Sequence, residues 1–115
     1  MSFEPEPELS ADEVQDRVDS AIEENDVVLF IKGTALMPQC GYSRKALGLV
    51  QQYRDEVETV NVLDALDEYR AALEEHSGWE TIPQAYVDGE FVGGSDVLEQ
   101  LDEQGDLEST LRVEA

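Results

Sequence analysis

VVLFIKGTALMPQCGYSRKALGLVQQYRDEVETVNV, residues 27–62, decides the fold of this 115-residue chain. The stretch opens with an uninterrupted apolar run at 27–31, which is typical of a strand that is covered on both faces. Apolar residues then recur at helical spacing from Tyr42 to Tyr53, and residues 57–62 predict a second strand. Strand, helix and strand at this spacing indicate a right-handed crossover between two parallel strands.

Two further helices are predicted on either side of this unit. Ser10 and Glu13 form a capping-box pattern at the start of a helix that ends near Asn25. Asp64 is expected to cap another helix, which runs to His76.

A hairpin and a last helix complete the predicted domain. The Asp88-Gly89 pair between two short apolar segments suits a two-residue antiparallel turn. After the hairpin, either Ser95 or Asp96 is expected to cap a final helix. The order helix, β, α, β, α, β, β, α predicts an α/β domain, in which helices flank both faces of a four-stranded mixed sheet.

The chain is strongly acidic, with 28 Asp and Glu residues against 7 Lys and Arg residues and a formal net charge of -21. Nucleic acid and anionic membranes are therefore excluded as partners. Such a surface suits concentrated salt, because ions at 1 M screen charges within roughly 3 Å. We hypothesise a halophilic, cytoplasmic protein, and a merely acidic cytosolic protein is the alternative. No export signal or membrane-spanning apolar segment is apparent in the sequence.

The length predicts one globular domain. Residues 1–9, which combine Glu with Pro5 and Pro7, are expected to form a disordered acidic leader. The folded domain is expected over residues 10–106, followed by a C-terminal helical tail at 107–115.

Cys40 is the single cysteine of the chain, and it stands where a loop turns into a helix. The free backbone N–H groups at such a helix start stabilise an anion and lower the pKa of a thiol. Arg44 and Lys45 add positive charge one turn further along. The alternative, an inert and buried cysteine, agrees less well with a neighbourhood of Pro38, Gly41 and two cations.

Four ordered motifs resemble a monothiol glutaredoxin of the CGFS class. They are Lys32-Gly33-Thr34, PQCGYS at 38–43, WETIPQ at 79–84 and DGEFVGGSD at 88–96. The resemblance extends from Ser10 to about Gln104. It implies a thioredoxin-like fold, a glutaredoxin domain at 10–106 and a cis peptide bond at Pro83.

The resemblance also implies a binding site for glutathione or another γ-glutamyl thiol beside Cys40. Lys32 and Arg70 would hold the glycine carboxylate, and the backbone of Ile82 would pair with the cysteine of the tripeptide. Ser95 and Asp96 would hold the γ-glutamyl end. The implied supporting residues are Gly41, Tyr42, Ser43, Pro83, Gly93 and Gly94. Glu80, which replaces a proline usual in the family, would mildly repel a ligand carboxylate.

Two functions follow from this resemblance, and both use Cys40. In the first, Cys40 is the metal ligand for a 2Fe-2S cluster shared by two protomers, because two chains and two small thiols together supply four thiolates. Such a cluster-bridged homodimer would serve iron-sulfur client or assembly proteins and redox homeostasis. In the second, Cys40 is the catalytic nucleophile of a glutathione-dependent thiol-disulfide oxidoreductase. A module that uses the cluster as a sensor is a third reading, so enzyme activity is left open.

Overall fold

The computed structural model describes residues 9–112. The acidic leader expected at 1–9 therefore lies outside the described residues except for Leu9, as do the last three residues of the tail expected at 107–115.

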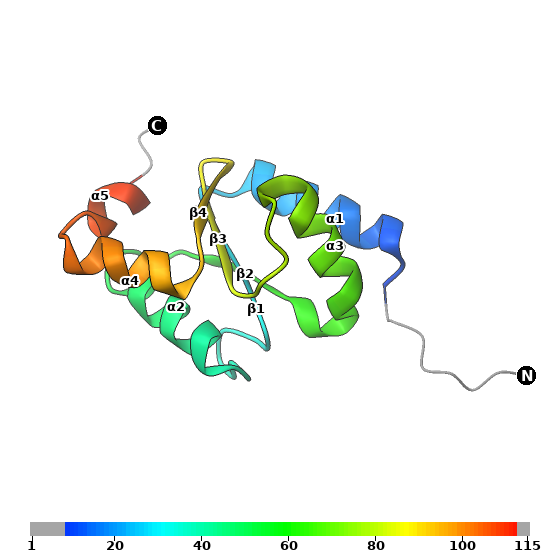
Figure 1. The fold of residues 1–115 in the computed structure, drawn as a ribbon, viewed down its shortest axis with the longest axis horizontal. Coiled ribbons are helices and arrows are strands. Elements are labelled where there is room, and N and C mark those ends of the chain that lie inside the picture. Colours follow the sequence, from blue (N-terminus) through cyan, green and yellow to red (C-terminus); the bar gives the residue numbers. More distant parts are fainter. Residues whose placement is uncertain (1–8, 113–115) are drawn as a thin grey trace, which may run out of the picture.

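Four strands form one mixed sheet in the order β2-β1-β3-β4 (Figure 1). β1 (Val27–Ile31) pairs in parallel with β2 (Glu58–Asn61) and antiparallel with β3 (Gln84–Val87). β3 and β4 (Glu90–Gly93) form the predicted antiparallel hairpin. The crossover from β1 to β2 is confirmed, although β2 is shorter at both ends than the predicted strand.

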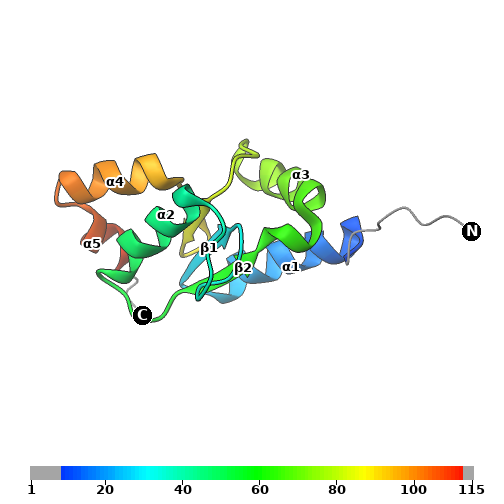
Figure 2. The ribbon, with the colours of Figure 1, turned by 90° about the horizontal axis from the view of Figure 1, so that it is seen from below.

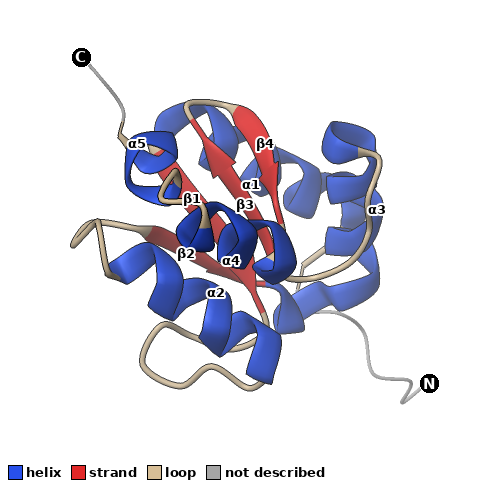
Figure 3. Ribbon diagram, turned by 60° about the vertical axis from the view of Figure 1, so that its left-hand side comes forward, coloured by secondary structure: helices blue, strands red, loops and turns tan. Residues whose placement is uncertain are grey.

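Helices cover both faces of the sheet, as predicted (Figure 3). One face carries α1 (Ala11–Glu24) and α3 (Leu66–Ser77). The opposite face carries three helices, α2 (Gly41–Gln51), α4 (Ser95–Glu103) and α5 (Leu107–Leu111). Figures 1 and 2 show the two groups of helices on opposite sides of the strands. The α/β fold class is thus confirmed.

The central strand β1 explains why two cores form. Val28 and Phe30 pack with α1 and α3, whereas Val27, Leu29 and Ile31 pack with α2 and α4. Successive side chains of a strand point to opposite faces, so a strand covered on both faces is apolar throughout. All five residues are buried.

The helix starts agree with the sequence only where a local motif decides them. Ser10 caps α1, and Glu13 completes the capping box. Asp64 does not cap α3, because it lies inside the short 3-10 helix η1 (Val62–Ala65). The Asn61 side chain caps η1 by accepting a hydrogen bond from the Leu63 N–H at 3.0 Å.

The cap of α4 also differs from the expectation. Gly94 is the N-cap residue, and its carbonyl accepts the first helical hydrogen bond, from the Leu98 N–H at 3.1 Å. Ser95 and Asp96 are therefore the first two residues of the helix. A side chain at Gly94 would place its Cβ 3.0 Å from the Pro83 carbonyl oxygen, so close packing favours glycine at this cap.

Helix α5 closes the second core. Leu107 and Leu111 are fully buried in the cluster that contains α2 and α4 residues. The Arg54 guanidinium donates a hydrogen bond to the Leu111 carbonyl at 3.0 Å. Across residues 9–112, each helix is too short or too polar to span a bilayer.

Candidate functional site

The chain between β1 and α2 folds into a closed loop at residues 32–39. The Gln39 N–H donates to the Lys32 carbonyl at 2.9 Å, and Gly33 and Pro38 form an isolated bridge. Gly33 has φ +97°, and an added Cβ would lie 2.5 Å from the Met37 carbonyl oxygen. Glycine is needed at this position because the backbone turns left-handed where two segments meet closely.

Asn61 ties this loop to the sheet. Its side-chain oxygen accepts hydrogen bonds from the N–H groups of Gly33 and Leu63, both at 3.0 Å. This role of Asn61 was not predicted from the sequence. An Asn directly after a strand is a local signal for such a turn, because its short side chain readily bonds nearby backbone.

Cys40 is the N-cap residue of α2 and is partly buried. Partial burial alone raises the pKa of its thiol, but several groups act in the opposite direction and outweigh it. They are the backbone N–H groups of Ser43 and Tyr42, the Ser43 hydroxyl and the positive charge of Lys32. Together they lower the pKa of Cys40 below its ordinary value, as the helix position predicted.

Ser43 connects the start of α2 to the end of β1. Its hydroxyl oxygen accepts a hydrogen bond from the Lys32 N–H at 3.1 Å, and the residue is fully buried. A hydroxyl has one hydrogen to donate. The oxygen accepts from the Lys32 N–H, and the hydroxyl hydrogen bonds to the Cys40 sulfur, which lowers the pKa of that thiol. Ser43 therefore both holds the loop and stabilises the thiolate.

The cations near Cys40 have different roles from those expected. Lys45 forms an ion pair with Glu99 and so joins α2 to α4. Arg44 donates to the Pro38 carbonyl at 3.4 Å and braces the loop. Lys32 is the cation that lowers the pKa of the thiol. The sequence could not separate these roles, because Glu99 is far away along the chain.

The sheet register brings three of the predicted segments together at one end of the strands. Phe30 lies opposite Gln84, and Ala85 lies opposite Gly93. The end of β1, the start of β3 and the end of β4 are therefore neighbours, next to the start of α2. The Ile82–Pro83 peptide bond is cis, as the resemblance implied.

The backbone of Ile82 is available to a ligand. Its N–H and C=O groups make no hydrogen bond to another residue within 9–112. Backbone polar groups require a partner, and an unpaired extended segment can pair with a peptide-like molecule. The implied ligand contact at Ile82 thus has the backbone groups it needs.

The remaining predicted ligand contacts come from both sides of the sheet. Ser95 is buried and Asp96 is exposed in the first turn of α4, where no N-cap side chain satisfies the backbone N–H groups. Arg70 is half-buried on α3, across the sheet from α4. Within residues 9–112, neither Arg70 nor Lys32 forms an ion pair with a carboxylate. Both cations are therefore available to an anionic ligand.

Three large apolar side chains in the predicted site segments point into solvent. Met37 is 71% exposed in the loop, and Tyr42 is 63% exposed in the first turn of α2. Trp79, in the loop before β3, is 60% exposed. Tyr42 thus belongs to the surface next to the thiol and not to the helix core.

These features together define a class of protein. A partly exposed thiol of lowered pKa lies at a helix start, next to a cis-proline loop with unpaired backbone. The arrangement is that of a thiol-dependent redox protein with a thioredoxin-like fold.

Comparison with known proteins specifies the family. The glutaredoxin family model matches residues 27–92. An uncharacterized monothiol glutaredoxin ycf64-like protein of Synechocystis is 45% identical over 101 residues, covering 88% of this chain and 94% of that protein. The mitochondrial monothiol glutaredoxin-5 of Schizosaccharomyces pombe is 45% identical over 98 residues, covering 83% and 66%.

Solved structures agree with this assignment. The solution structure of reduced poplar apo GrxS14 has a TM-score of 0.74 and 36% identity, covering 85% of this chain and 89% of that one. The chain belongs to the glutaredoxin family and resembles its monothiol members. Its chemistry is therefore the glutathione-related thiol chemistry of that family.

Proposed function

We propose that this glutaredoxin carries a 2Fe-2S cluster as cargo between two protomers, each of which contributes Cys40. Glutathione or another γ-glutamyl thiol would complete the ligand set. The proposed recipients are iron-sulfur client or assembly proteins, and we propose a high-salt cytoplasm as the location.

The donor set is the observation that carries this proposal. The sequence holds one cysteine, and within residues 9–112 no three His, Cys, Asp or Glu side chains gather closely enough to bind a metal ion. A 2Fe-2S cluster normally takes four thiolate-type ligands. One chain supplies one thiolate of lowered pKa, so the set fits the cluster when two chains and two small thiols combine.

The surroundings of Cys40 support the use of a small acidic thiol. Lys32 and Arg70 are free of ion pairs within the described residues, and the N-terminus of α4 favours negative charge. Ile82 offers unpaired backbone just before Pro83, whose carbonyl approaches Gly94 at the start of α4. These positive groups would complement the two carboxylates of a γ-glutamyl peptide. Two of the four cluster ligands would then come from small thiols that can exchange.

Anaerobic reconstitution with iron, sulfide and glutathione tests the proposal. Visible absorbance of a 2Fe-2S centre and elution as a dimer are expected for the wild-type protein. Cys40→Ser should lose both, and so should wild type from which the small thiol is omitted. Met37→Ser, a substitution in the exposed loop nearby, is the matched control and should retain the cluster. A cluster in Cys40→Ser, or full yield without small thiol, would contradict the proposal.

Salt should favour the dimer. Two chains of charge -21 repel each other, and roughly molar salt shortens the range of that repulsion to about 3 Å. Cluster yield is therefore expected to rise from dilute buffer to molar potassium chloride. Equal yields would remove the support for a salt-adapted carrier.

The lowered pKa of Cys40 favours thiol-disulfide exchange as the second candidate function. The Cys40 thiolate would attack the glutathione sulfur of a mixed disulfide and release the client thiolate. A second glutathione thiolate would then attack that glutathione sulfur, which releases Cys40 and forms glutathione disulfide. Turnover on a glutathionylated peptide, with no cluster formed in reconstitution, would favour this function over the carrier.

A further inference from the structure

We propose that Gln84 is a positioning residue, which holds the loop at 79–81 so that the unpaired backbone of Ile82 meets the γ-glutamyl thiol. The inference rests on small-thiol binding as proposed above. It adds a residue that does not itself touch the ligand.

The Gln84 side chain is fully buried at the start of β3. Its amide nitrogen donates to two carbonyls of the preceding loop, to Trp79 at 2.6 Å and to Thr81 at 3.1 Å. Its amide oxygen accepts from the Tyr86 hydroxyl at 2.8 Å and lies 3.1 Å from the Ser77 hydroxyl. An amide side chain has two donor hydrogens, and both have a loop carbonyl as partner. Tyr86 donates to the amide oxygen. The single hydrogen of the Ser77 hydroxyl is shared among that oxygen and the Leu73 and Trp79 carbonyls.

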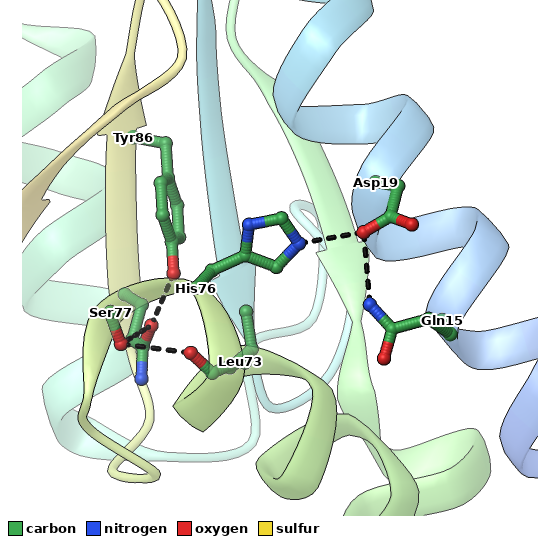
Figure 4. A network of polar contacts seen from close by, with 7 residues as sticks. Gln15, Asp19, Leu73, His76, Ser77 and Tyr86 are labelled. Atoms are coloured by element: carbon green, nitrogen blue, oxygen red, sulfur yellow. Dashed lines mark hydrogen bonds and ion pairs between the residues drawn. The ribbon is translucent and has the colours of Figure 1, made fainter.

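Two hydroxyl groups lie on the other side of the Gln84 amide, those of Tyr86 and Ser77. Figure 4 shows their hydroxyl groups close together between α3 and β3. The Trp79 and Thr81 carbonyls can only accept, so the amide nitrogen must face them, and the amide oxygen faces the Tyr86 hydroxyl, which donates to it. Ser77 also accepts from the Trp79 N–H at 3.0 Å, which fixes the start of the same loop.

The loop at 79–81 depends on these bonds. All three of its residues are exposed, and within residues 9–112 their backbone has one further hydrogen-bond partner, the Ser77 hydroxyl, which lies 3.1 Å from the Trp79 carbonyl oxygen. An exposed segment with few bonds is free to move unless buried groups hold it. Gln84 turns two carbonyls inward just before Ile82, and the Ile82 peptide groups remain unpaired for the ligand.

Disulfide exchange in the cluster-free protein measures this positioning directly. The Cys40 thiolate attacks one sulfur of glutathione disulfide, which forms the Cys40-glutathione disulfide and releases one glutathione thiolate. The same attack on 2-hydroxyethyl disulfide needs no peptide site. The ratio of the rate constant with glutathione disulfide to that with 2-hydroxyethyl disulfide measures how much the peptide site contributes. Taking this ratio removes the effect of thiol reactivity, which both reactions share. The rate constant is also measured with the disulfide of γ-glutamylcysteine. Whichever of the two peptide disulfides reacts faster with the wild-type protein is then used for all variants.

Gln84→Met keeps a similar volume and removes the amide. It is expected to lower the ratio about tenfold, since a misplaced binding segment costs rate even where the reacting group is intact. The rate with 2-hydroxyethyl disulfide should stay near wild type. Tyr86→Phe is the matched control, because it removes a bond to the same amide but leaves both loop carbonyls held. Its ratio should be close to wild type.

Ser77→Ala tests the same loop if Gln84→Met does not fold. It frees the Trp79 N–H and should lower the ratio by a smaller factor. The proposal is overturned if the folded Gln84→Met protein, or Ser77→Ala in its place, keeps the wild-type ratio. It is also overturned if Tyr86→Phe loses as much as Gln84→Met, because the effect would then be general loosening. A wild-type ratio near one for both peptide probes would instead refute the small-thiol site itself.

Discussion

Two loops lie at the end of the sheet where α2 begins, and each is secured by an amide side chain. Asn61 accepts hydrogen bonds from two backbone N–H groups and secures the loop at 32–39. Gln84 donates hydrogen bonds to two backbone carbonyls and secures the loop at 79–81. The first loop also has its own backbone bridge and the bond from Gln39 to Lys32. The second has no such bridge among the described residues. A loop that has hydrogen bonds within its own backbone depends less on a side-chain anchor than a loop that lacks them.

The largest effect should come from removing the buried anchor. Gln84→Met leaves the Thr81 carbonyl and the Tyr86 hydroxyl without their partner and the Trp79 carbonyl with the Ser77 hydroxyl alone, and should lower the free energy of unfolding by about 2–4 kcal/mol. Asn61→Ala should cost about 1–2 kcal/mol, because Asn61 is half-buried and its loop retains other bonds. Urea unfolding in molar salt measures both. Asn61→Asp keeps the acceptor oxygen and is the control. A larger loss for Asn61→Ala would reverse the comparison.

Gly33 tests how firmly the first loop holds itself. Gly33→Ala forces a side chain onto φ +97° and against the Met37 carbonyl, so a loss of about 1–3 kcal/mol is expected. Gly48→Ala lies in α2, where an added Cβ meets nothing within 4 Å. It should stabilise the protein by about 0.5–1 kcal/mol. Thermal unfolding of the two variants measures both changes in stability. If Gly33→Ala were as stable as wild type, the loop would have to shift easily to make room for the added Cβ.

Ser43 joins the first loop to the thiol. Ser43→Ala removes a hydrogen bond that favours the thiolate, so the pKa of Cys40 should rise and alkylation at neutral pH should slow. The measurement is the rate of reaction with iodoacetamide against pH, whose midpoint should move upward. Arg44→Ala removes a nearby charge that braces Pro38 and should leave the midpoint close to wild type. An unchanged midpoint in Ser43→Ala would assign the lowered pKa to the helix backbone and Lys32.

The smallest effect concerns the helix that precedes the second loop. His76 on α3 lies 2.7 Å from Asp19 on α1 (Figure 4), and hydrogen bonds from His76 and Gln15 lower the pKa of Asp19. A carboxyl whose pKa is lower in the folded state stabilises above its unfolded pKa, and loses that contribution as pH falls through the folded value. The pair is exposed, so Asp19→Asn should cost below about 1 kcal/mol at pH 5.

The pH dependence of that difference is the check. Asp19→Asn should be less stable than wild type in urea at pH 5, and the two proteins should converge near pH 2. Asp16→Asn, an exposed aspartate of the same helix, should show no such convergence. A difference that persists at pH 2 would mean that the ion pair is not its source.

The parts of the fold that depend on residues close together along the chain could be predicted from the sequence. The capping box of Ser10, the run at β1 and the Asp88-Gly89 turn are local, and the structure has all three. The cap at Asp64 and the cap at Ser95 or Asp96 were wrong. Those helix starts depend on the end of β2 and on the approach of Pro83 to Gly94, which are set by packing.

The candidate site divides in the same way. Cys40 at a helix start with a lowered pKa could be predicted, because the larger of the lowering contributions come from Tyr42 and Ser43, within three residues of it. The pairing of Lys45 with Glu99 and the anchors Asn61 and Gln84 could not, because their partners come from elements that meet in space.

By itself the sequence determined the elements, the thiol and the family motifs, since each depends on residues close together along the chain. The tertiary structure alone decided which cations remain free for a ligand and which side chains hold the two loops. Hydrogen bonds and ion pairs between distant segments exist only after the sheet register and helix packing have brought their partners within about 3 Å.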